Sequence, residues 1–99
     1  MAANNMRPIH PGEILRDEIE TIGASARMLA VALKVPPNRV NAILNESRGI
    51  TADTALRLAR FFGTSPELWL NLQSAYDLRR ARRNVGARIA REVKPRSAA

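Results

Sequence analysis

With 99 residues, no cysteine, 45% hydrophobic and 25% charged residues, the chain has the composition of one globular domain, without disulfides or thiolate metal sites. Its apolar runs are far shorter than the ~20 residues of a membrane span and residues 1–7 lack a signal-peptide core, so we expect a cytoplasmic protein with no membrane partner. The formal net charge of +7 is typical of proteins that bind nucleic acid.

Apolar residues recur at helical spacing along the chain, and no segment alternates like a strand. The first helix is predicted to begin at Pro11, since proline suits a first turn, and to stop at Gly23. Its inward-facing residues are predicted to be Ile14, Leu15, Ile19 and Ile22.

Two short helices joined by a tight turn are predicted next. Ser25 can cap the first of them, and the proline pair after Val35 must end it. Pro37 can open the following helix, which ends near Asn45. The inward residues are Leu29, Ala30 and Leu33 in the first of these helices, and Val40, Ile43 and Leu44 in the second. This arrangement is a helix-turn-helix.

Two further helices complete an all-α bundle of five. Thr51 and Gly63 have the residue types that begin and end a helix, and Ser65 followed by Pro66 begins another. Their predicted apolar faces are Ala55, Leu56, Leu58, Ala59 and Phe62 for the fourth helix, and Leu68, Trp69, Leu72 and Tyr76 for the fifth.

The predicted domain organisation is a disordered N-terminus over residues 1–7, a helix-turn-helix domain over 8–83, and a basic extension over 84–99. In the extension Val85, Ile89 and Val93 keep a helical spacing, but Gly86 costs about 1 kcal/mol within a helix. Partial helix, contact with DNA phosphates and a free solvated tail all remain open. We favour a non-specific electrostatic role over an ordered fold.

The second helix of a helix-turn-helix enters the major groove of DNA and is called the recognition helix. Asparagine pairs with adenine, arginine with guanine, and alanine contacts the thymine methyl group. The alternative is an ordinary solvated helix face. The predicted base-reading residues are Pro37, Asn38, Arg39, Asn41, Ala42 and Asn45.

Phosphate contacts are predicted where helices begin, because free amide groups there favour anions. Ser25 and Arg27 open the second helix, and Arg48 and Thr51 precede the fourth. The two hydroxyl residues have helix capping as an equally good explanation, and one side chain can do both.

Charge is distributed unevenly, with a net charge of −2 over residues 1–23 and +7 over residues 79–99. Such asymmetry favours two different partners, although charge runs also simply solvate a surface. The acidic residues of the first helix are Glu13, Asp17, Glu18 and Glu20. Catalysis and metal binding are not expected, since His10 is the single histidine and no cysteine is present.

Several segments together resemble one family. They are His-Pro-Gly-Glu-Ile-Leu from His10, Arg-Val-Asn from Arg39, Arg-Gly-Ile-Thr from Arg48, Asp-Thr-Ala-Leu-Arg-Leu-Ala from Asp53, and Phe-Gly-Thr-Ser-Pro from Phe62, followed by Trp69, Leu72-Gln73 and Tyr76-Asp77-Leu78. Over residues 8–81 the chain resembles HigA-type antitoxins, a branch of the lambda-repressor-like (XRE) helix-turn-helix proteins. Two departures are Ala26, where many XRE proteins carry glutamine, and Pro37, where a polar side chain is frequent.

The resemblance implies a five-helix lambda-repressor-like domain without cofactor or catalytic activity. It also implies a homodimer that binds an inverted repeat in its own promoter, and a HigB-type toxin of the RelE-like ribonuclease class as partner. We expect the four acidic residues of the first helix to bind that toxin, and Leu70, Tyr76 and Leu78 to form the dimer contact. A stand-alone regulator without a toxin and a pure protein-interaction module are the alternatives.

Overall fold

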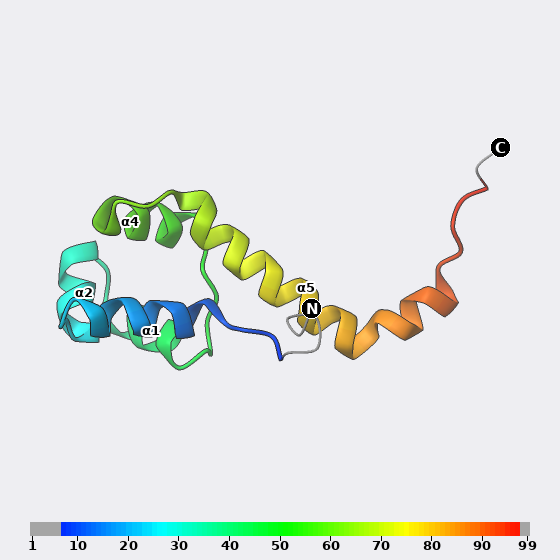
Figure 1. Ribbon diagram of the computed structural model, residues 1–99, viewed down its shortest axis with the longest axis horizontal. Helices are drawn as coiled ribbons and strands as arrows, with labels where there is room; N and C mark the ends of the chain where they lie inside the picture. The colour runs from blue at the N-terminus through cyan, green and yellow to red at the C-terminus, as the bar shows by residue number, and fades with distance from the viewer. Residues whose placement is uncertain (1–6, 98–99) are drawn as a thin grey trace.

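The computed structural model describes residues 7–97, which form five α-helices and no strand. Residues 1–6, from the predicted disordered N-terminus, and residues 98–99 lie outside the described part. The helices are α1 (Pro11–Thr21), α2 (Ala26–Leu33), α3 (Pro37–Leu44), α4 (Ala52–Phe62) and α5 (Pro66–Glu92) (Figure 1). The all-α prediction is confirmed, and the helix-turn-helix is α2 followed by α3.

The helices begin where the sequence predicted. Pro37 is the first residue of α3. Three hydroxyl oxygens accept the N–H group of the residue three positions later: Ser25 from Met28 at 3.1 Å, Thr51 from Thr54 at 3.4 Å and Ser65 from Leu68 at 3.1 Å. Each satisfies an amide that has no partner within its helix.

Left-handed residues close several helices. Gly63 ends α4 with φ of 72°, as its lack of a Cβ favours. The two helices of the helix-turn-helix end instead on side-chain-bearing residues in the same conformation, Lys34 after α2 and Glu46 after α3, with φ of 61° and 64°. This conformation is unfavourable for an L residue. Two backbone hydrogen bonds close the turn after α2, from the Lys34 N–H to the Val31 carbonyl at 3.2 Å and from the Val35 N–H to the Ala30 carbonyl at 3.0 Å.

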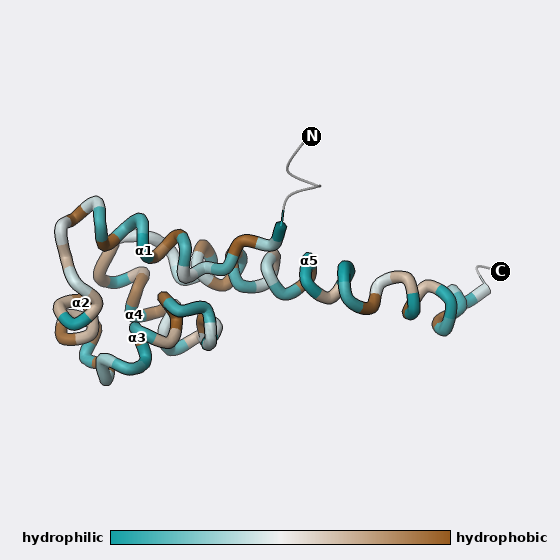
Figure 2. Tube along the Cα trace, turned by 90° about the horizontal axis from the view of Figure 1, so that it is seen from below, coloured by the Kyte–Doolittle hydropathy of each residue, from teal (hydrophilic) through white to brown (hydrophobic). Residues whose placement is uncertain are grey.

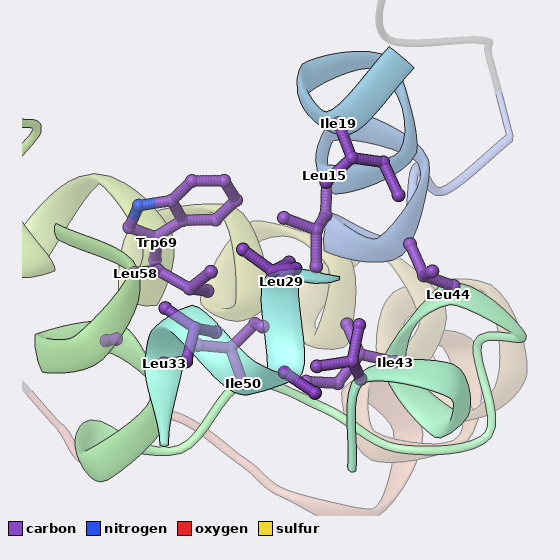
Figure 3. Packing of buried hydrophobic residues seen from close by; sticks show 12 residues of the cluster. Leu15, Ile19, Leu29, Leu33, Ile43, Leu44, Ile50, Leu58 and Trp69 are labelled. Carbon is purple, nitrogen blue, oxygen red and sulfur yellow. The ribbon is translucent and has the colours of Figure 1, made fainter. Parts of the chain in front are cut away.

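The core lies between α1, α2, α3, α4 and the first turns of α5 (Figure 3). The Trp69 ring is almost fully buried, and its Nε1 donates to Thr64 Oγ1 at 3.0 Å. Among the large side chains packed there, those labelled in Figure 3 are Leu15, Ile19, Leu29, Leu33, Ile43, Leu44, Ile50, Leu58 and Trp69.

Three predicted core positions are wrong. Ile22 lies after the last residue of α1 and is 50% exposed, because the chain there no longer follows the helical stripe. Leu56 is 60% exposed, since Ala55, Leu58 and Ala59 form the inner face of α4. Leu68 is also exposed, on the side of α5 away from the core.

Helix α5 is much longer than the core requires. Its second half leaves the bundle and runs into solvent (Figures 1 and 2), and the molecule extends 54 Å along its longest axis. Of the possibilities left open for the basic extension, the structure has the partial helix, since residues 84–92 belong to α5, and an ordered fold was the less favoured expectation there. Alanine and arginine are strong helix formers, and together they outweigh the cost of Gly86.

Candidate nucleic-acid interface

The start of α1 is built to approach α3 closely. His10 Nδ1 accepts the N–H of Gly12 at 2.8 Å, and the buried imidazole packs edge-on against Tyr76. A Cβ at Gly12 would collide with the carbonyl oxygen of Ile43 in α3, so only glycine fits. The backbone of α1 therefore supports the recognition helix α3 directly.

Both helices of the helix-turn-helix have a C-terminal carbonyl group satisfied by an arginine of another helix. Arg16 of α1 donates to the carbonyl of Leu44, the last residue of α3, at 3.1 Å. Arg57 of α4 donates to the carbonyl of Leu33, the last residue of α2, at 2.9 Å. Each cation also lies at the negative end of a helix dipole. The two contacts hold α2 and α3 between their neighbours.

The outer face of α3 carries amide side chains. Asn38 and Asn41 are exposed, as are Pro37 before them and Asn45 after the helix. Ala42 is half-buried. Asparagine side chains on an exposed helix face can pair with base edges, and α3 itself contains no acidic residue.

Arg39 differs from the other predicted base-reading residues, because it is already bound within the protein. Its side chain is 25% exposed, and its Nη1 donates to Asp53 Oδ1 of α4 at 3.0 Å. The same oxygen accepts from Arg57 Nε at 2.7 Å. The hydrogen bond from Arg57, together with the charges of both arginines, holds the pKa of Asp53 below its usual value.

The loop before α4 is held by α5. Gln73 Oε1 accepts the N–H of Ile50 at 2.7 Å, and a Cβ at Gly49 would displace the end of the Gln73 side chain. Arg48 at the start of this loop and Thr51 at its end are exposed. The fixed loop therefore presents both predicted phosphate ligands to solvent.

The other two predicted phosphate ligands, Ser25 and Arg27, lie at the N-terminus of α2 and are exposed. The structure thus places the predicted DNA contacts on the recognition helix and at the starts of α2 and α4. Sequence reasoning missed the supporting side chains Arg16, Asp53, Arg57 and Gln73. Only the spacing of Asp53 and Arg57, four residues apart, was a usable signal.

Known proteins share this architecture. The helix-turn-helix family model matches residues 15–69. Virulence-associated protein I of Dichelobacter nodosus is 60% identical over 79 residues, which are 79% of this chain and 73% of that protein. An addiction module antidote protein of the HigA family from Coxiella burnetii is 60% identical, with a TM-score of 0.90 over 92% of this chain and 100% of its own. The chain belongs to the HigA-type helix-turn-helix family.

A third similar protein is the Pseudomonas aeruginosa antitoxin HigA, solved with the higBA promoter. It is 52% identical, with a TM-score of 0.87 over 90% of this chain and 98% of its own. The resemblance to HigA-type antitoxins and the lambda-repressor-like fold class are therefore confirmed. HigA-type proteins are DNA-binding regulators and not enzymes, in agreement with the sequence.

The acidic residues of this HigA-type chain differ in their environment. Glu13 is half-buried and accepts a bidentate pair of hydrogen bonds from Arg7, at 2.6 and 2.9 Å, which lowers its pKa. Arg7 was assigned to the disordered N-terminus, but this ion pair holds it on α1. Asp17, Glu18 and Glu20 are exposed and form no ion pair within the described residues. They are the accessible part of the predicted toxin surface.

The predicted dimer residues also differ. Leu70 packs partly against the core, so it is less available than predicted. Tyr76 is half-buried between His10 and the Arg80 guanidinium, which lies 5.5 Å from its ring centre. Leu78 lies near the middle of α5 and is 51% exposed. Only Leu78 has the exposure of an unoccupied contact.

Within residues 7–97, no helix combines the length and apolarity needed to cross a membrane. The same residues contain no group of three or more histidine, aspartate or glutamate side chains arranged to hold a metal ion.

Proposed function

We propose that the chain is the antitoxin of a type II toxin–antitoxin pair. In this proposal it dimerises, binds an inverted repeat in its own promoter and represses it. It also binds and neutralises an mRNA-cleaving toxin of the HigB type. The observation that carries the DNA-binding part is the exposed asparagine face of α3, held in place by α1 and α4.

The similarity to a HigA antitoxin solved with its promoter supports DNA as the partner. In the proposed complex, α3 enters the major groove and its outward residues read bases, while the starts of α2 and α4 contact phosphates. Asn38 and Asn41 are the main base-reading side chains, because they are exposed and have no other partner in the described structure.

Alanine variants test the assigned face. Asn38→Ala and Asn41→Ala should each weaken operator binding by about 1–3 kcal/mol and reduce discrimination from random DNA, because each removes a base contact. Arg48→Ala serves as the contrasting variant. It should weaken binding to all sequences alike and make the salt dependence shallower by about one phosphate. Titrations of operator and scrambled duplexes at several salt concentrations measure both. If the asparagine variants keep full discrimination, another surface reads the DNA.

The toxin contact is proposed for the exposed acidic residues of α1. A nuclease that acts on RNA needs a basic surface, which carboxylates complement. Asp17 and Glu20 lie one turn apart, outside the buried stripe of Leu15 and Ile19. Since α1 packs behind α3, the toxin and the operator can be bound at the same time.

Charge reversal tests this surface. Asp17→Lys with Glu20→Lys should slow toxin association strongly at low salt, because interface charges act mainly on the association rate. Operator binding should stay intact. Stopped-flow or biosensor association rates provide the measurement. Equal rates for the variant and the parent would contradict the toxin surface, whereas a parent chain that binds no toxin would favour a stand-alone regulator.

The dimer is proposed because one recognition helix makes too few contacts for specific binding, whereas two half-sites lie about 34 Å apart on DNA. Leu78 on α5 is the most exposed of the predicted contacts, whereas Tyr76 is half-buried and Leu70 packs partly against the core. Sedimentation at micromolar concentration measures the state directly. A monomeric mass there would contradict the dimer.

A further inference from the structure

Asp53 places a carboxylate next to the recognition helix of a chain whose proposed ligand is a polyanion. It lies in the first turn of α4, two residues after the predicted phosphate ligand Thr51. Its Oδ1 binds Arg39 of α3 at 3.0 Å and Arg57 of its own helix at 2.7 Å. Such a carboxylate repels DNA phosphates, and it occupies the one arginine of α3.

The bond between Arg39 and Asp53 competes with DNA. A guanidinium recognises guanine through two parallel N–H groups, and Nη1 of Arg39 is already donating to Asp53. The contact also ties the side chain to α4 and leaves it only 25% exposed, so the side chain has to turn away from Asp53 before it reaches a base or a phosphate. Exchange is feasible because the contact is at the surface, with Asp53 itself exposed.

Arg57 keeps the carboxylate in place during such an exchange. It binds Asp53 through Nε and the Leu33 carbonyl through Nη1, so it is anchored at both ends. When Arg39 leaves, Asp53 still has an ion-pair partner. The carboxylate is thus neither left unpaired nor free to follow Arg39 toward the DNA.

We propose that Asp53 is a specificity-determining residue that withholds Arg39 from DNA of the wrong sequence. On random DNA, Arg39 exchanges the Asp53 carboxylate for a phosphate oxygen, so little binding free energy is gained. The nearby carboxylate also repels the DNA phosphates. On the operator, the arginine gains a base contact that exceeds the one it loses. This inference rests on the proposed function, in that α3 is taken to read DNA.

The test is Asp53→Asn, which keeps the shape of the side chain and removes its charge. The probes are a duplex carrying the site that the wild-type chain protects in its own promoter, and a scrambled duplex of equal length. Affinity of the variant for scrambled DNA should rise about two- to five-fold, the scale of an exposed ion pair, with the salt slope steeper by about one. Affinity for the operator should change less, so the ratio between the two falls.

Two further variants separate this mechanism from a general gain of positive charge. Glu67→Gln removes a charge from the first turn of α5, where Glu67 is exposed, and should leave the ratio unchanged. In an Arg39→Gln background, Asp53→Asn should lose most of its effect on scrambled DNA, because the carboxylate then has no recognition-helix arginine to withhold. Arg39→Gln alone should weaken the operator complex more than the scrambled one, because it removes the base contact that the proposal assigns to Arg39. Equal weakening of the two complexes overturns the inference even if Asp53→Asn fails to fold.

The results distinguish the inference from the proposed function. A wild-type chain that binds the promoter site and scrambled DNA equally overturns the proposed function and this inference with it. A wild-type preference with the same ratio in Asp53→Asn overturns the inference alone. An equal effect of Asp53→Asn with and without Arg39 also overturns it.

Discussion

At the scale of single residues, Gly12 shows how one missing side chain positions the candidate site. Gly12→Ala places a methyl group on the carbonyl oxygen of Ile43, and neither backbone can move without disturbing the core. We expect a loss of about 1–3 kcal/mol in the free energy of unfolding, the range for overpacking. Urea denaturation measures the change.

Gly86→Ala is the matched control, since the substitution is the same and the nearest atom to the added Cβ is the Arg82 Cβ at 3.8 Å. This variant should unfold at the same or a slightly higher urea concentration, because alanine favours the helix. Equal losses in the two variants would show that contact with Ile43 is not what requires glycine at position 12.

At the scale of helices, the ends of α2 and α3 depend on arginines from elsewhere in the sequence. Arg16→Met keeps much of the side-chain volume but leaves the Leu44 carbonyl without its donor. We expect about 1 kcal/mol of lost stability, typical of one hydrogen bond, and weaker operator binding because the end of α3 is loosened.

Arg27→Met provides the comparison for stability, since Arg27 is exposed and makes no hydrogen bond within the described structure. Thermal unfolding of the two variants should separate them. Equal midpoints would mean that water replaces Arg16 at the end of α3 without loss.

Helix boundaries were predictable because their signals are local. Ser25, Thr51 and Ser65 each accept the amide three residues on, which is a short-range property of the chain. Which side chains point into the core was less predictable, both near the end of a helix and on a helix that other helices cover on one side only. Ile22 is exposed because α1 ends one residue earlier, and Leu56 because it lies on the outer side of α4, which no other described helix covers.

The location of the candidate site was predictable, but the contacts that its side chains make within the protein were less so. The order of α2, turn and α3 indicated the recognition helix from residue types alone. That Arg39 is bound to Asp53, fourteen residues away, depends on the packing of α3 against α4. No periodicity reports such a contact. Likewise, the ion pair between Arg7 and Glu13 depends on the path of the irregular segment before α1, which helical spacing does not predict.

At the scale of the whole molecule, the acidic and the basic surfaces lie on different parts of an elongated chain. The bundle carries the acidic face of α1, and the projecting half of α5 carries exposed arginines. Replacing Arg82, Arg83, Arg88 and Arg91 by glutamine keeps the helix and removes four positive charges. DNA affinity should fall most at low salt, with an unchanged preference for the operator, because these charges act on phosphates of any sequence.

Deletion of residues 84–99 should have the same direction of effect as the glutamine variant. Affinity measured at low and high salt for both variants would reveal any difference between losing charge and losing helix. If low-salt affinity stays at the wild-type level in both, the extension is a solvated segment without a role in DNA binding.

The length of α5 has a consequence for how the molecule opens. Its first turns carry Trp69 into the core, whereas residues 81–97 are exposed except for Val85 and Gly86, which are partly covered. The amide protons of this second half are protected by helical hydrogen bonds alone and exchange with solvent through fraying. Those near Trp69 exchange only when the bundle opens. The two halves of one continuous helix thus differ in their free energy of opening. A partner that binds the outer half would slow amide hydrogen exchange there.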